Sequence, residues 1–314
     1  MIWPAYTPVT PKLLEQASNL GIRLTKEDCE SAGDTLIMAA DATFDELDTV
    51  FREAGETGSV MIKDLRQTAL PMLIETLSTG SLIQFLVHLR RKDDITLTHS
   101  IGVAALSIML GRWLNLSSEE LTDLAVAALL HDIGKLRIER HLLNKPGKLT
   151  VGEYEEIKKH TVYGYEMLRN SPDIKELCAL PALRHHERLN GTGYPNRLTG
   201  DAIDKFSRLI AVTDVFHAMS SNRSYKDRIP FYHVIREMHA SAFGQFDPDF
   251  TLVFLSKMME TLIGTEVVLS NGKTAVIVAL NPSDPFRPLV RVNGRFLDLG
   301  RAENLHIMGY SPVN

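Results

Sequence analysis

The chain has 314 residues, enough for about two domains, and its 34 Lys and Arg against 39 Asp and Glu give a formal net charge of −5. Hydrophobic residues make up 44% of the chain and charged residues 23%, which excludes a largely disordered protein. The acidic balance argues against a non-specific nucleic-acid binder, because such proteins need a basic excess. Two cysteines, Cys29 and Cys178, are too few for a disulfide framework and indicate a reducing compartment. We find neither a membrane-spanning apolar run nor a signal peptide, so we expect a cytoplasmic protein without a membrane span.

Residues 1–80 mix short apolar runs with Pro, Gly and Thr and are predicted to form a small mixed N-terminal domain. Its core candidates are residues 36–40, which suit a strand or a buried helix, and residues 47–51, which suit an amphipathic helix. This region carries no metal-ligand cluster or phosphate-binding loop. We interpret it as a regulatory domain, joined by a connector helix over residues 82–91; the alternative is a packing extension that completes the catalytic fold.

Residues 81–263 have a helical pattern. An apolar helix is predicted from Leu97 to Trp113, and a second, almost wholly apolar helix from Leu121 to His131. Ser117 and Glu120, like Thr150 and Glu153, have the spacing of a capping box, in which each side chain bonds the other residue's backbone N–H. The second box is predicted to open one helix that runs to about residue 169.

Residues 264–314 change to a strand pattern. Asn271-Gly272 and Asn293-Gly294 each lie between apolar runs, and Asn-Gly suits the two positive φ angles of a type I′ hairpin turn. The sequence therefore predicts a small β module, barrel-like or sandwich-like, after a mainly α chain.

The middle region also carries seven imidazole and carboxylate side chains beside apolar residues: His99, His131, Asp132, His160, His185, His186 and Asp214. Each one alone suits a hydrogen-bonded core residue. Asp214 lies in the apolar stretch 209–216, however, and a buried carboxylate is costly unless a charge or a metal pairs with it. One metal cluster satisfies all seven. Two ions about 3.5–4 Å apart, bridged by a carboxylate and a water molecule that attacks a phosphoester, use seven such ligands.

Polar side chains near these residues suit a phosphorylated substrate. Lys135 follows His131-Asp-Ile-Gly and is best interpreted as a phosphate contact; the alternative is a solvated lysine at a helix end. Tyr194 lies in a loop of Gly191, Gly193 and Pro195, where it suits stacking on a base, bonding a phosphate, or packing. Arg223 and Lys226 form a small cationic group that suits phosphate or solvent.

The ordered set His131-Asp-Ile-Gly-Lys135, His160, His185-His-Glu187, Gly191-Thr-Gly-Tyr-Pro195 and Asp214 resembles the HD-GYP family, over about residues 90–256. These are HD-type phosphohydrolases that hydrolyse cyclic di-GMP. The resemblance implies an HD-type helical bundle with all seven metal ligands present and Asp132 bridging two divalent ions, non-haem iron or, alternatively, manganese. It also implies substrate contacts by Lys135, Tyr194, Arg223 and Lys226, catalytic roles for Asp132 and Lys135, and linear pGpG as the product, with GMP as a further step.

Ile95 stands four residues before His99, where many members carry Tyr and three-metal members carry Glu. Since Ile cannot ligate a metal, the resemblance implies two ions and weak turnover. His217 stands where many members carry Asp and suits either a site role or an exposed position. The alternatives are a low-activity cyclic di-GMP receptor, which signals to a protein such as a diguanylate cyclase domain through Gly193-Tyr194-Pro195, and an HD phosphohydrolase with another nucleotide substrate.

Overall fold

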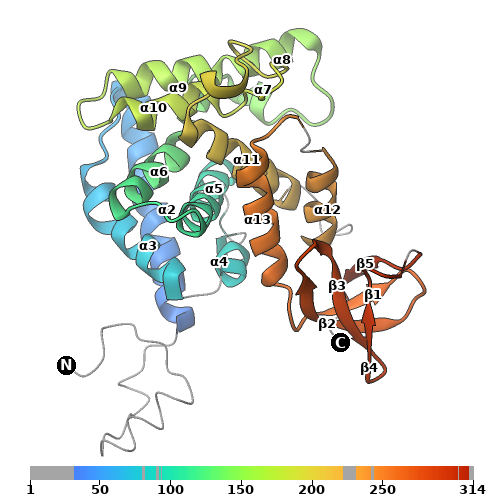
Figure 1. Cartoon of the computed structure of the whole chain (residues 1–314). Helices are drawn as coiled ribbons and strands as arrows, with labels where there is room; N and C mark the ends of the chain where they lie inside the picture. Colours follow the sequence, from blue (N-terminus) through green and yellow to red (C-terminus); the bar gives the residue numbers. More distant parts are fainter. Residues whose placement is uncertain are drawn as a thin grey trace, which may run out of the picture. The chain divides into compact units, whose positions relative to one another are not determined.

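The computed structural model of the chain (Figure 1) describes residues 32–79, 82–89, 92, 94–221, 231–241, 244–302 and 304–310. Its contacts divide the chain into two compact units. The first comprises Met1–Arg112 and Leu116–Arg184, and the second comprises Trp113–Asn115 and His185–Asn314. The predicted division at residues 80 and 263 is not tested by this grouping and stays a prediction. Each unit is described by itself.

The described part of the first unit is helical. In chain order its elements are α2 (Ala32–Thr57), η2 (Leu65–Ala69), α3 (Leu70–Thr79), α4 (Leu82–Leu89), α5 (Ile95–Trp113, whose last residue belongs to the second unit), α6 (Ser118–Leu130), η3 (Ile133–Arg137), α7 (Arg140–Leu143), α8 (Val151–Lys158), α9 (His160–Arg169) and α10 (Glu176–Arg184). Residues 36–40 and 47–51 therefore belong to one helix, α2, and the predicted connector helix is α4 over its described residues.

Helix α5 is apolar around its whole circumference, and most of its residues from Leu97 to Gly111 are buried, as expected for a core helix. By length and composition α5 could also cross a membrane, but 67% of its most apolar window is buried inside the structure. Such burial is typical of the core helix of a folded domain.

Local sequence signals set several helix boundaries. Both predicted capping boxes are present, Ser117 with Glu120 at the start of α6 and Thr150 with Glu153 at the start of α8. The single helix predicted from residue 150 to about residue 169 is wrong in one respect. It is divided at Lys159 into α8 and α9, so that His160 is the first residue of α9.

In its described part, the second unit combines three α-helices and a short 3-10 helix with a five-stranded antiparallel sheet. After η4 (Gly200–Ala202) come α11 (Lys205–Ser221), α12 (Phe231–Ser241) and α13 (Pro248–Glu260), and then β1 (Glu266–Leu269), β2 (Thr274–Asn281), β3 (Asp284–Val292), β4 (Arg295–Asp298) and β5 (Ile307–Tyr310), in the sheet order β4-β3-β2-β1-β5. The Asn293-Gly294 turn joins β3 to β4 with φ of 47° and 78°, which confirms that hairpin.

Candidate metal centre

The first unit contributes four of the predicted ligands, gathered around Asp132. The apolar helix α6 ends at Leu130, and His131 and Asp132 follow it as buried residues. The Asp132 Oδ2 atom lies 3.3 Å from His131 Nε2 and 3.8 Å from His99 Nε2. The Asp132 Oδ1 atom lies 3.3 Å from His160 Nε2. Three imidazoles from α5, the end of α6 and the start of α9 therefore face one carboxylate.

Backbone carbonyls orient two of these imidazoles. His131 Nδ1 lies 2.7 Å from the carbonyl oxygen of Ala128, and His160 Nδ1 lies 2.7 Å from that of Ile157. A carbonyl only accepts hydrogen bonds, so Nδ1 carries the proton and donates it. In a neutral ring Nε2 then presents a lone pair. Bonding of the second ring nitrogen in this way is what orients histidines that bind metals.

The charge states favour a cation at this cluster. Burial lowers the pKa of His160, which favours its neutral form. Burial opposes the ionisation of Asp132, but the nearby charges of Lys135 and His131 outweigh it and hold the pKa of that carboxyl well below its usual range. The ionised Asp132 Oδ1 atom and the Nε2 lone pair of a neutral His160, only 3.3 Å apart, repel each other unless a proton or a metal ion lies between them. Nitrogen and oxygen donors of this kind suit zinc, iron and manganese, so the residues present fit a divalent metal.

Lys135 also lies at this cluster. Its Nζ atom donates a hydrogen bond to Asp132 Oδ2 over 2.5 Å, from the short helix η3. The same turn contains Gly134, where a Cβ atom would lie 1.9 Å from the carbonyl oxygen of His160 and 2.4 Å from Gly164 N. Only glycine permits this approach of η3 to α9. Gly134 therefore sets how closely His160 approaches Asp132.

The second unit contributes the remaining predicted ligands. His185 and His186 follow directly after Arg184, the last residue of α10, with their ring centroids 4.0 Å apart. The Tyr194 ring stacks on His186 with a centroid distance of 4.6 Å and an interplanar angle of 27°. Asp214 lies buried on α11, and His217, one turn further along, is also buried rather than exposed.

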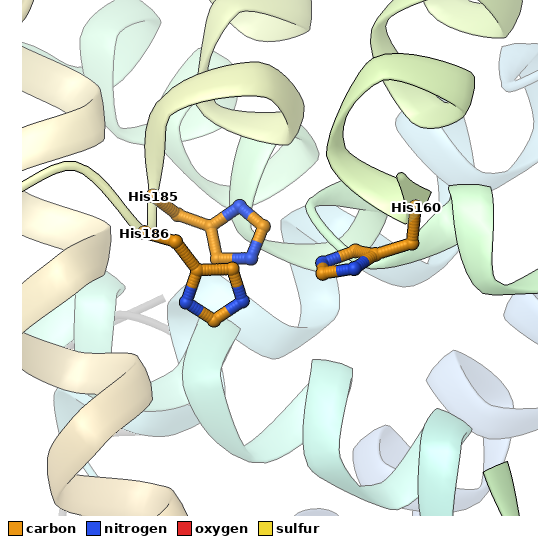
Figure 2. A group of neighbouring side chains, drawn as sticks. All are labelled: His160, His185 and His186. Carbon is orange, nitrogen blue, oxygen red and sulfur yellow. The ribbon is translucent and has the colours of Figure 1, made fainter. Parts of the chain in front are cut away.

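Three groups of these side chains each bring their potential ligand atoms within 4.8 Å of one another: His160, His185 and His186; His99, His131 and Asp214; and His131, Asp132 and His185. Figure 2 shows the first group, with the three imidazole rings turned toward a common space. Every predicted ligand belongs to at least one group. Groups of three ligands within this spacing suit metal binding, since one ion contacts several donors at once.

Two predicted substrate residues, Arg223 and Lys226, lie outside the described residues. Ile95 is the first residue of α5, and 82% of its surface is exposed. The sequence reasoning assigned no role to Glu187, although its buried carboxylate accepts two backbone hydrogen bonds. Its place directly after two predicted ligands was the available signal.

Comparisons with known proteins show the family to which the chain belongs. The family model described as "HD domain" matches residues 65–250, more than half of the chain. A cyclic di-GMP phosphodiesterase of Pseudomonas aeruginosa is 35% identical over 239 residues, which cover 73% of this chain and 58% of that protein. A 3'3'-cGAMP-specific phosphodiesterase of Vibrio cholerae is 36% identical over 158 residues, which cover 50% of this chain and 34% of that protein. This chain thus spans only part of both relatives.

The fold also matches a solved structure, that of an HDG"Y"P protein from Bdellovibrio bacteriovorus. The TM-score is 0.58 at 15% sequence identity, with 78% of each chain covered, which supports a shared fold. The resemblance to the HD-GYP family expected from the motifs is therefore confirmed, and the chain belongs to the HD domain family.

Proposed function

We propose that this protein is a metal-dependent phosphodiesterase that hydrolyses cyclic di-GMP. The observation that carries the proposal is the buried Asp132 carboxylate, faced by the Nε2 atoms of His131 and His160 while both Nδ1 atoms bond backbone carbonyls. Relatives that align with this region are named phosphodiesterases of cyclic dinucleotides, which supports the same class of substrate. HD domains of this ligand composition bind divalent metals, in keeping with the three groups of side chains.

The metal ligands in this proposal are the seven predicted residues, with Asp132 shared between two ions. Bound divalent ions acidify a water molecule and neutralise charge on a phosphodiester. The protein's own residues do the rest. His131 and His160 keep their protons on Nδ1, where the carbonyls hold them, and Lys135 adds a positive charge beside Asp132 for a phosphoryl oxygen. Tyr194, stacked on His186, provides an aromatic face for a guanine base.

The finer features remain part of the proposal. They are two ions rather than one, iron with manganese as the alternative, attack by a water molecule between the ions, linear pGpG as the product, and a cytoplasmic location. The ligand count supports the number of ions, because seven donors exceed what one ion takes. Signalling to a diguanylate cyclase domain through Gly193-Tyr194-Pro195 is likewise a proposal.

A second function, that of a receptor with weak turnover, is favoured by Ile95. This residue stands four positions before His99 on α5 and offers no ligand atom for a third ion. A receptor keeps the binding groups and loses rate, so affinity for cyclic di-GMP and the rate of hydrolysis separate the two functions.

The test is metal analysis of protein purified without oxygen, followed by product analysis with cyclic di-GMP and, separately, with 3'3'-cGAMP. We expect two ions per chain and conversion of cyclic di-GMP to linear pGpG. Tight binding of cyclic di-GMP without turnover supports the receptor. If 3'3'-cGAMP is hydrolysed faster than cyclic di-GMP, the preferred substrate is 3'3'-cGAMP, the one in the name of the Vibrio relative. Full activity in a metal-free protein contradicts the proposal.

A further inference from the structure

Residues 187–199, which we call the glycine-tyrosine loop, are tied together by the side chain of Glu187. Glu187 is buried, with only 2% of its surface exposed. Its Oε1 atom accepts a hydrogen bond from the backbone N–H of Asn196 over 2.7 Å, and its Oε2 atom accepts one from that of Leu198 over 2.9 Å. Because a buried carboxylate is costly without such partners, the two bonds are strong ties between the beginning of the loop and its far end.

The Gly193 segment of the same loop packs closely against Glu187 and His186, where the loop begins. A Cβ atom on Gly193 would lie 2.4 Å from the Cα of Glu187 and 2.5 Å from the carbonyl oxygen of His186. The next residue, Tyr194, donates its backbone N–H to that carbonyl over 3.3 Å and stacks its ring on the His186 imidazole. The position of the Tyr194 ring therefore depends on the Gly193 segment staying packed against His186 and Glu187.

A second set of contacts holds the base of the loop. Leu189 N–H donates to the carbonyl of Gln245 over 2.9 Å, and Gly200 N–H donates to the carbonyl of Leu189 over 3.1 Å. Asn190 and Thr199 form an isolated antiparallel bridge across this base. Asn196 and Leu198 lie between these anchors and the Tyr194 segment, where Glu187 holds them. The base and the Glu187 ties are separate sets of hydrogen bonds.

We propose that Glu187 is a positioning residue that fixes Tyr194 against His186 for contact with the cyclic dinucleotide. The inference rests on the proposed function, since it takes that ligand as the substrate. A loop that contains Gly191 and Gly193 loses much conformational entropy when it is ordered. If Glu187 orders the loop before the substrate binds, the entropy cost of ordering the loop does not weaken substrate binding. Loss of the ties then weakens substrate binding and leaves the metal ligands in place.

The experiment compares the wild-type protein with Glu187→Gln. The glutamine amide nitrogen cannot accept a hydrogen bond, so one tie is lost and the other loses its charge. We expect faster amide hydrogen exchange at Asn196 and Leu198, while the amides of Leu189 and Gly200 at the base stay protected. We also expect KM for cyclic di-GMP to rise about tenfold, equivalent to about 1.4 kcal/mol, with kcat and metal content little changed.

Two further variants keep the test decisive. Glu153→Gln is the matched control, because Glu153 also accepts a backbone N–H, from Thr150, but lies on α8. It should change neither KM nor exchange in the loop. Glu187→Asp retains two acceptor oxygens, so it should restore part of the affinity and serves if the glutamine variant fails to fold. In a Tyr194→Ala background, Glu187→Gln should raise KM no further, because the side chain through which it acts is absent.

The outcomes separate this inference from the proposed function. If the wild type neither binds nor hydrolyses cyclic di-GMP, the proposed function fails, while amide exchange still reports whether Glu187 holds the loop. If Glu187→Gln frees the Asn196 and Leu198 amides but KM stays at the wild-type value, the positioning role is overturned and the function stands. If both amides stay protected, the ties themselves are wrong.

Discussion

At the scale of single residues, two buried carboxylates, Asp123 and the proposed metal ligand Asp132, differ in their surroundings. Asp123 on α6 pairs with the cationic side chains of Arg66 and Lys175, the latter over 2.7 Å. Asp132 is faced by imidazoles as well as by Lys135. Two cations pair with Asp123, whereas Asp132 pairs with one cation and also faces imidazole nitrogens, the donors that a metal ion would share with it.

Asp132→Ala should therefore lose bound metal and hydrolysis together, because it removes the carboxylate that faces His131 and His160. Metal analysis and a cyclic di-GMP assay check this. Asp123→Asn is the matched control, since it should lower the melting temperature by weakening a buried ion pair while metal content stays full. Normal metal content and activity in Asp132→Ala contradict the bridging role.

Lys135→Ala should keep its metal and bind cyclic di-GMP roughly tenfold or more weakly, since a charge-assisted hydrogen bond is worth about 1.5–3 kcal/mol. The reason is that Lys135 Nζ lies beside the Asp132 carboxylate, where a substrate phosphate would gain a cationic partner. Binding measured on metal-loaded protein is the readout. Lys257→Ala, which removes an exposed lysine paired with Glu260, should leave affinity unchanged. If Lys135→Ala and Lys257→Ala bind cyclic di-GMP equally well, the substrate phosphate does not contact Lys135.

At the scale of elements, the approach of η3 to α9 depends on two glycines that face each other. A Cβ on Gly134 would lie 2.9 Å from the Cα of Gly164, and a Cβ on Gly164 would lie 3.5 Å from the Cα of Gly134. Because the atoms that a side chain would meet belong to the backbone, they cannot move aside without shifting a helix. This crossing therefore sets the distance between Asp132 and His160.

Gly134→Ala should cost at least about 1–3 kcal/mol of unfolding free energy and weaken metal binding, because its new methyl group overlaps the His160 carbonyl. Denaturant unfolding and metal titration measure the two effects. Gly152→Ala is the control, since a Cβ there meets nothing within 4 Å and alanine favours a helix. Equal stability of both variants would show that the crossing tolerates a side chain.

The capping box of α8 predicts a pH-dependent stability. Two bonds from Lys145 Nζ, each 2.7 Å long, and one from Thr150 N–H lower the pKa of Glu153 to about 2. A lowered folded-state pKa gives stability that is present above the unfolded value of 4.5 and is lost as pH falls toward 2. Wild type should melt higher than Glu153→Gln at pH 7, and this difference should shrink between pH 4.5 and pH 2. A difference that is constant with pH contradicts the role of the charge.

At the scale of the whole molecule, the described residues of the N-terminal region contact α5, α6 and the segment after α9, which carry or adjoin predicted metal ligands. Val60 N–H donates to Ser171 Oγ over 3.0 Å, and Arg112 Nη1 donates to the carbonyl of Ile74 over 3.1 Å. Arg66 pairs with Asp123 across 57 positions of sequence. On these contacts we expect residues 32–79 to be a packing extension rather than a separate regulatory domain, and this stays a prediction.

A shortened chain that starts at Thr79 should therefore be insoluble or fail to bind metal, because it exposes the apolar surface covered by α2 and α3 and leaves Asp123 without Arg66. A chain that starts at Ala32 retains these contacts and should fold. Solubility, metal content and mass in solution are the measurements. If the chain from Thr79 is soluble, metal-loaded and altered only in rate or oligomeric state, the regulatory hypothesis stands.

The sequence by itself determined whatever depends on neighbours along the chain. Capping boxes, the Asn-Gly hairpin of β3 and β4, and the core character of α5 follow from spacings of a few residues. The ordered motifs identified the family and the types of ligand, because those residue types are required wherever the chain folds around a metal.

The tertiary structure decided whatever depends on residues distant in sequence. It grouped residues 32–79 with α5 and α6, revealed that Gly134 permits the approach of His160, and assigned Glu187 its two amide partners. It also showed that Asp123 pairs with Arg66 and Lys175, whereas Asp132 is faced by imidazoles. The physical reason is that periodicity records which face of an element is buried, whereas the partner across that face, and hence a carboxylate's charge balance, is set by how the elements pack.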